Sequence, residues 1–82
     1  MVSERDKQIF GIIMQEFILT GEPVGSRVVS RRYDLNVSPA TIRNVMADLE
    51  EYGFVASPHT SAGRVPTARG YRLFVDRLLA VE

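Results

Sequence analysis

The sequence predicts a small, mainly α-helical domain that also contains one short β-hairpin. Two observations indicate this class. Apolar residues recur with the helical period of about 3.6 residues in several segments, and a glycine then precedes two short β-prone stretches that flank a turn-rich loop. The chain has 82 residues, of which 45% are apolar and 24% charged, as is ordinary for a globular protein. We therefore expect one domain over residues 1–82, with a single modest core.

The first helix is expected to begin near Glu4. Ser3, followed three residues later by Asp6, resembles a capping box in which Asp replaces the usual Glu. Gly21 predicts the end of the helix. Helical periodicity predicts an inward face made of Ile9, Ile12, Ile13, Glu16 and Phe17, widened by Phe10, Met14 and Ile18.

A short second helix is expected over residues 27–33, with Ser26 as its cap. Residues 34–36 have the composition of a turn. The side chains expected to face the core in this part of the chain are Val28, Val29, Tyr33, Leu35 and Val37.

The third helix has the clearest signals. Ser38 suits the cap and Pro39 the first helical position, while Gly53 suits the C-terminal stop. The buried stripe is predicted to be Ile42, Val45, Met46 and Leu49, which follow the i, i+3, i+4, i+7 spacing.

Two strands should follow, over residues 54–56 and 64–66, around a loop at 58–63; Pro66 must end its strand or lie at an edge. Thr67 can cap a last helix, which Gly70 weakens slightly. The apolar residues of that helix are Tyr71, Phe74, Val75, Leu78 and Leu79. This order of elements predicts a winged helix-turn-helix: a three-helix core, a wing and a C-terminal helix.

Charge is segregated along the chain, although the net charge is zero. Residues 26–43 and residues 59–72 each carry +3, whereas residues 1–25, 44–58 and 73–82 carry −2, −3 and −1. Binding to a polyanion depends on the local field more than on the total charge. Nucleic acid therefore remains a possible partner, the alternative being ordinary solvated charges that cluster by chance.

The exposed face of the third helix has the chemistry needed to read DNA bases. At about 100° per residue, Ala40, Asn44 and Ala47 point away from the buried stripe and Arg43 lies beside them. Arginine can bind guanine, and asparagine adenine, through two hydrogen bonds in the major groove. The alternative is a merely solvated helix face. The predicted recognition residues are Ser38, Ala40, Thr41, Arg43 and Asn44.

Two further groups are predicted to contact DNA. The arginines of the second helix would contact phosphates, unless they are simply exposed charges; they are Arg27, Arg31 and Arg32. The hairpin tip offers hydroxyl groups to phosphates and an arginine to a narrow minor groove. The predicted wing residues are His59, Thr60, Ser61 and Arg64.

The composition argues against other function classes. There is no cysteine and only one histidine, which argues against disulfides and metal sites. No paired carboxylates, catalytic triad or phosphate-cradling glycine loop is evident, so we expect no enzyme activity, no cofactor and no small-molecule substrate. No apolar run is long enough for a signal peptide or a membrane span, and we expect a cytoplasmic protein with no membrane partner.

Several segments, in order and over nearly the whole chain, resemble the N-terminal DNA-binding domain of HrcA, the bacterial heat-inducible transcription repressor. They are SERDKQI, GEPVGSR, SPATIRNVMADLE, PHTSAGRVPT and GYRLFVDRLL. The resemblance implies repression of heat-shock chaperone operons through an inverted-repeat operator in double-stranded DNA. It also implies that full-length members dimerise and respond to the chaperonin GroEL. The family continues past these 82 residues into a regulatory and dimerisation region.

Two other hypotheses about the function stay open at this point. The helix could dock on a protein partner, although small and polar outward residues disfavour that use. The domain could also regulate another operon.

Overall fold

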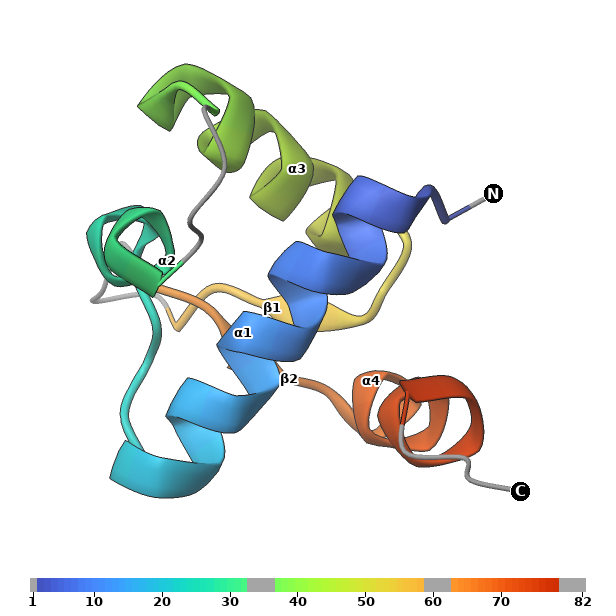
Figure 1. The fold of residues 1–82 in the computed structure, drawn as a ribbon. Helices are drawn as coiled ribbons and strands as arrows, with labels where there is room; N and C mark the ends of the chain where they lie inside the picture. Colours follow the sequence, from blue (N-terminus) through green and yellow to red (C-terminus); the bar gives the residue numbers. More distant parts are fainter. Residues whose placement is uncertain (1, 33–36, 59–62, 79–82) are drawn as a thin grey trace.

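The computed structural model describes residues 2–32, 37–58 and 63–78. In chain order (Figure 1) its elements are α1 (Glu4–Thr20), α2 (Ser26–Arg32), α3 (Pro39–Glu51), β1 (Val55–Ala56), β2 (Val65–Pro66), α4 (Ala68–Leu73) and the π-helical η1 (Phe74–Leu78), which continues α4. The strands form a two-stranded antiparallel sheet. The predicted class, a mainly α winged helix-turn-helix, is confirmed.

The capping box of α1 forms as predicted. The Ser3 hydroxyl accepts from the Asp6 N–H and the Asp6 carboxylate accepts from the Ser3 N–H, each at 3.1 Å, and Gly21 ends the helix in the left-handed conformation. The predicted inward face is wrong at Ile18, which is 59% exposed. The last turn of α1 extends past the core, so helical periodicity alone overestimates the buried face.

Helix α2 begins one residue earlier than predicted. The Gly25 carbonyl accepts from the Val29 N–H at 3.3 Å, so Ser26 is the first helical residue and not the cap. Val29 is buried and Val28 is half-buried. Among the other predicted core residues of this region, Val37 packs against the core, whereas Tyr33, Leu35 and the predicted turn at 34–36 lie outside the described residues.

Helix α3 has both predicted ends and the predicted buried stripe. The Ser38 hydroxyl accepts from the Thr41 N–H at 3.1 Å, and all four stripe residues are buried. At the other end, Gly53 has φ +87° and donates to the Glu50 carbonyl, while Phe54 donates to the Leu49 carbonyl. This is a Schellman motif, which favours glycine at the left-handed position. It also explains why Phe54 is not part of the strand.

The hairpin is shorter than predicted, with Val55 opposite Pro66 and Ala56 opposite Val65. Pro66 ends its strand, and the Thr67 hydroxyl caps α4 by accepting from the Gly70 N–H at 3.0 Å. Gly70 is not a weakness of that helix. A Cβ there would overlap the Phe54 carbonyl oxygen, so the close approach of α4 to the hairpin requires glycine.

The apolar residues of the last helix divide between core and surface. Phe74 is buried, whereas Tyr71 is 41% and Val75 57% exposed. The Leu78 side chain and Leu79 lie outside the described residues.

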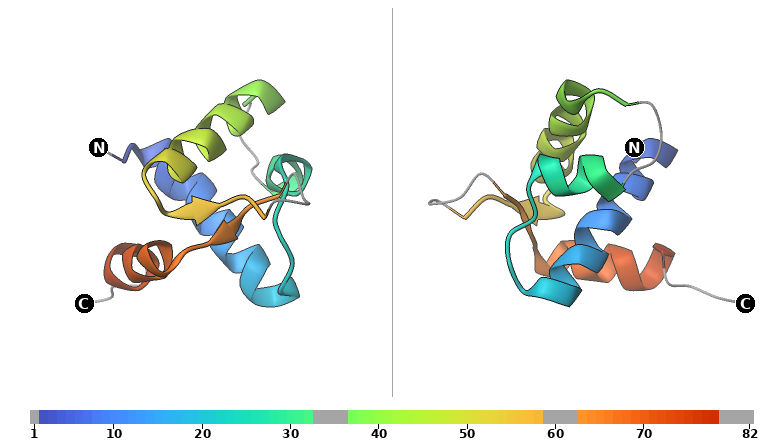
Figure 2. Two further views of the ribbon diagram at one scale, coloured as in Figure 1. Left: turned by 180° about the vertical axis from the view of Figure 1, so that it is seen from behind. Right: turned by 60° about the vertical axis from the view of Figure 1, so that its left-hand side comes forward.

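The core lies where α1, α3 and the hairpin meet, and α2 and α4 flank it at opposite ends of the molecule (Figures 1 and 2). Its largest fully buried side chain is Phe10, whose ring lies 6.0 Å from that of Phe54. None of the helices in the described parts of the chain is both long and apolar enough to cross a membrane.

Candidate nucleic-acid interface

Burial of one stripe of α3 fixes which of its residues face solvent. Ala40, Arg43, Asn44 and Ala47 are all exposed, and Thr41 is half-buried. The Thr41 hydroxyl lies 3.0 Å from that of Ser38, so both hydroxyl groups stand at the helix N-terminus. The face predicted from angular spacing is therefore the solvent face of α3, while its use in recognition stays a prediction.

Two adjoining hollows lie beside this face, and arginines from three elements line them. The larger, of about 480 Å³, has Gly25, Ser26, Arg27, Arg43, Met46 and Arg64 in its described lining. The smaller, of about 350 Å³, is lined by Ser26, Arg27, Ser30, Arg31, Pro39 and Arg43. The structure thus brings four of the predicted arginines together, from α2, α3 and the wing.

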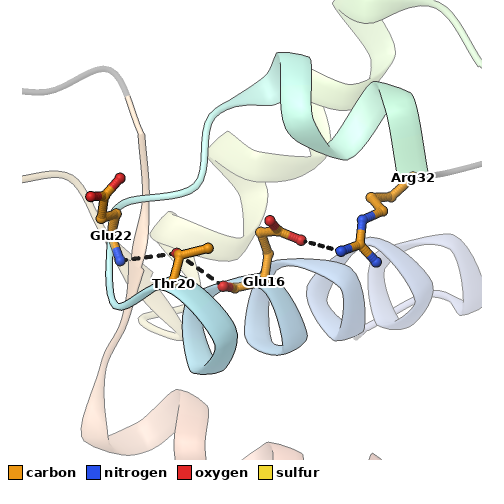
Figure 3. A network of polar contacts seen from close by, with 4 residues as sticks. All are labelled: Glu16, Thr20, Glu22 and Arg32. Carbon is orange, nitrogen blue, oxygen red and sulfur yellow. Dashed lines mark hydrogen bonds and ion pairs between the residues drawn. The ribbon is translucent and has the colours of Figure 1, made fainter.

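Arg32 faces a different way from the other arginines of α2. Its guanidinium makes a 2.8 Å ion pair with Glu16 of α1 (Figure 3). Thr20 donates to the Glu16 carbonyl at 3.0 Å and accepts from the Glu22 N–H at 3.1 Å, so the same stretch of α1 also caps its own end. The predicted phosphate contact of Arg32 would compete with this internal ion pair.

Arg64 lies at the base of the wing and not at its tip. Its N–H and carbonyl exchange hydrogen bonds with those of Val24, at 2.9 and 2.8 Å. Its side chain is only 19% exposed, and its Nε lies 3.0 Å from a Glu50 carboxylate oxygen. The wing is thereby joined both to the segment before α2 and to α3.

The remaining wing predictions, His59, Thr60 and Ser61, lie outside the described residues. Sequence reasoning did not single out Glu50, which contacts Arg64. The Glu50 carboxylate also accepts from the Ser57 hydroxyl at 3.0 and 3.1 Å. The only available signal was an acidic residue one turn before the glycine stop, next to a basic hairpin.

The far half of α3 is acidic. Asp48 and Glu51 are exposed there, while the neutral and basic residues occupy the first turns. Among the residues that the structure describes, no group of three or more His, Cys, Asp or Glu side chains could hold a metal ion. The candidate interface presents guanidinium, amide and hydroxyl groups.

Known proteins resemble this chain closely over a limited length. It is 64% identical over 81 residues to the heat-inducible transcription repressor HrcA of Geobacter sulfurreducens, covering 99% of this chain and 24% of that protein. The identity to HrcA of Clostridium perfringens is 58% over 82 residues, again with 24% of the relative covered. HrcA of Moorella thermoacetica is 59% identical over 78 residues, which are 95% of this chain and 23% of that repressor.

A solved structure has the same fold. The crystal structure of a hypothetical protein at 2.2 Å resolution superposes with a TM-score of 0.90 and 38% identity, over 96% of this chain and 24% of that one. No protein-family model matches the chain. The chain spans about a quarter of the length of the relatives it matches. The resemblance read from the motifs is thus confirmed along the whole chain, which is homologous to one quarter-length segment of the HrcA repressors.

Proposed function

We propose that this chain is a sequence-specific module for double-stranded DNA, with the N-terminal half of α3 in the major groove. One observation carries the proposal: Arg43 and Asn44 are exposed on α3 beside hollows lined by Arg27 and Arg31. Arginine and asparagine side chains distinguish guanine and adenine in the major groove. Arginines beside them would bind the phosphates that flank the bases being read.

The shape and charge of α3 support this docking. Ala40 and Ala47 are exposed and have short side chains, which would allow the helix to approach the base edges closely. Phosphates are attracted to the positive end of a helix dipole, where Ser38 and Thr41 present hydroxyl groups. The acidic residues occupy the other end, where a tilted helix leaves the groove.

The hypothesis that α3 docks on a protein has less support. Large exposed hydrophobic residues would be needed on such a face. In the described part of the chain these are Ile18, Leu19, Tyr71 and Val75, which lie on α1, α4 and η1 and not on α3.

We further propose that the DNA target is an inverted-repeat operator of heat-shock genes, read by two copies in a repressor. The support is that the relatives are heat-inducible transcription repressors by name. Dimerisation and the GroEL response are proposed for the longer repressors. A single copy would contact one half-site. It should bind more weakly than two linked copies, because in a linked pair the binding of one copy raises the effective concentration of the other copy at the second half-site.

The test starts from a selection of bound duplexes from a random-sequence pool, followed by fluorescence-polarisation titration of the enriched duplex and a scrambled one. Arg43→Ala and Asn44→Ala should each cost roughly 1–3 kcal/mol on the enriched duplex and relax the preference at one base pair. Arg31→Ala is the matched control, since a lost phosphate contact should weaken both duplexes about equally. Unchanged affinity of Arg43→Ala for both would refute the recognition-helix assignment.

A further inference from the structure

We propose that Glu50 is a positioning residue for DNA binding, which holds Arg64 over the hollow between α2 and α3 so that Arg64 contacts a backbone phosphate. The inference rests on the proposed function and changes one part of it. Arg64 would act from the base of the wing on a phosphate, and not from its tip in the minor groove.

Glu50 joins both ends of the wing to α3. Its carboxylate accepts from Ser57, just after β1, at 3.0 and 3.1 Å, and pairs with Arg64, just before β2, at 3.0 Å. Ser57 and Arg64 therefore bracket the loop of the hairpin and are held by one side chain. The carboxylate is well placed to select one orientation of the arginine.

The backbone of Arg64 is fixed independently of that ion pair. Two hydrogen bonds to Val24, of 2.8 and 2.9 Å, tie it to the segment that leads into α2. With the backbone fixed, the remaining conformational variation of Arg64 lies in its long side chain. Immobilising such a side chain opposes binding because conformational entropy is lost, and a carboxylate that orders the side chain beforehand removes part of that cost.

The environment of Arg64 indicates an anionic ligand. Arg27 of α2 and Arg43 of α3 line the same hollow as Arg64, whose charge the Glu50 carboxylate neutralises in part. The positive charge that remains around this open space attracts an anion. Arginine matches the geometry of a phosphate with two parallel hydrogen bonds, so a DNA phosphate fits this space.

Glu50 and its neighbour Glu51 should respond to substitution in opposite directions. Removing an acidic residue from a helix that approaches DNA should strengthen binding, because one repulsive charge is lost. Glu51 is exposed and no ion pair is found for it in the described parts of the chain, so Glu51→Ala should behave in this way. Glu50→Ala removes the same charge one residue earlier, and should instead weaken binding about three- to tenfold.

The experiment measures the affinity of the chain for a labelled duplex of mixed sequence between about 50 mM and 200 mM salt. Wild type, Glu50→Ala, Glu51→Ala, Arg64→Met and the Glu50→Ala/Arg64→Met double variant are compared, each shown to be folded by circular dichroism at the assay temperature. If Glu50 acts through Arg64, Glu50→Ala causes no further loss of affinity once Arg64 is replaced and then behaves like Glu51→Ala. Glu50→Ala and Arg64→Met should each reduce the salt slope.

Three results would contradict the inference. These are equal affinities of Glu50→Ala and Glu51→Ala, the same loss from Glu50→Ala with and without Arg64, and a loss of affinity with an unchanged salt slope. The last two would show that Glu50 only stabilises the fold. Absence of binding by the wild-type chain at low salt would instead refute the proposed function itself, so the two failures are distinguishable.

Discussion

At the scale of single residues, two glycines in helices have opposite roles. Gly70 of α4 is buried against the hairpin, where a Cβ would overlap the Phe54 carbonyl oxygen and lie 3.3 Å from the Phe10 ring. A Cβ at Gly11 of α1 would instead meet no neighbouring element within 4 Å. One glycine is required by packing and the other is not.

We therefore expect Gly70→Ala to lower the free energy of unfolding by about 1–3 kcal/mol, because the added methyl group must displace backbone. Gly11→Ala should raise it by roughly 0.5–1 kcal/mol, since alanine has the higher helix propensity and meets no obstacle. Urea denaturation followed by circular dichroism measures both. A stabilising Gly70→Ala would show that α4 can move away from the hairpin at little cost.

Residue roles that depend on local spacing could be predicted, and those that depend on tertiary contact could not. Ser3 and Asp6 cap α1 as their spacing predicts, because both partners lie within one turn. The ion-pair partner of Glu50, in contrast, is Arg64, which lies 14 residues further along the chain. The sequence offered only the sign of the Glu50 charge, which does not indicate that its carboxylate contacts Ser57 and Arg64.

At the scale of elements, α3 depends on its two end signals. The Ser38 hydroxyl accepts a hydrogen bond from the Thr41 N–H at 3.1 Å. The exposed residues proposed to read bases lie within the two turns that follow. Loss of the cap should let this end of α3 fray. Frayed turns would present Arg43 and Asn44 less well to a groove.

Ser38→Ala should therefore cost about 1 kcal/mol in the free energy of unfolding and also weaken binding to the enriched duplex. Ser30→Ala on α2 is the control, because Ser30 is exposed within a helix and alanine there has the better propensity. Thermal and urea unfolding of the two variants give the comparison. Equal stabilities would mean that tertiary packing, and not the cap, holds the start of α3.

Periodicity and caps could predict the elements themselves, including α3 from its cap to its glycine stop. They failed where a boundary depends on a partner elsewhere. Phe54 has a β-prone side chain, yet its N–H donates a hydrogen bond to the Leu49 carbonyl at the C-terminal end of α3. The exposure of Ile18 follows likewise from where the neighbouring elements end, which no local pattern records.

At the scale of the whole molecule, a chain with no net charge presents a basic region made from separate segments. Arg27, Arg31, Arg43 and Arg64 line adjoining hollows, while α4 lies at the opposite end of the molecule from α2 (Figure 1). Segment charges could predict that basic regions exist. Only the fold shows that Arg64 of the second basic segment meets the first, whereas Arg69 and Arg72 lie on α4.

Binding should accordingly weaken steeply with salt, and each phosphate contact should contribute about 0.9 to the slope of log K against log salt. Arg31→Ala should reduce the magnitude of that slope by roughly 1. Arg72→Ala on α4 removes an equal charge far from α2 and should leave the slope nearly unchanged. Polarisation titrations at several salt concentrations measure this slope. Equal slopes for the two variants would show that Arg31 does not contact a phosphate.

The hydrogen bonds of Ser57 and Arg64 also make the stretch between them exchangeable. Glu50 of α3 contacts both Ser57 and Arg64, and Val24 also forms backbone hydrogen bonds with Arg64. When a loop is closed between two fixed ends, the entropic cost of closing it grows slowly with its length, by about 0.6 kcal/mol for each doubling. Wings of different length and composition should therefore be accepted between Ser57 and Arg64, and exchanging them would test whether the wing contributes to the proposed DNA preference.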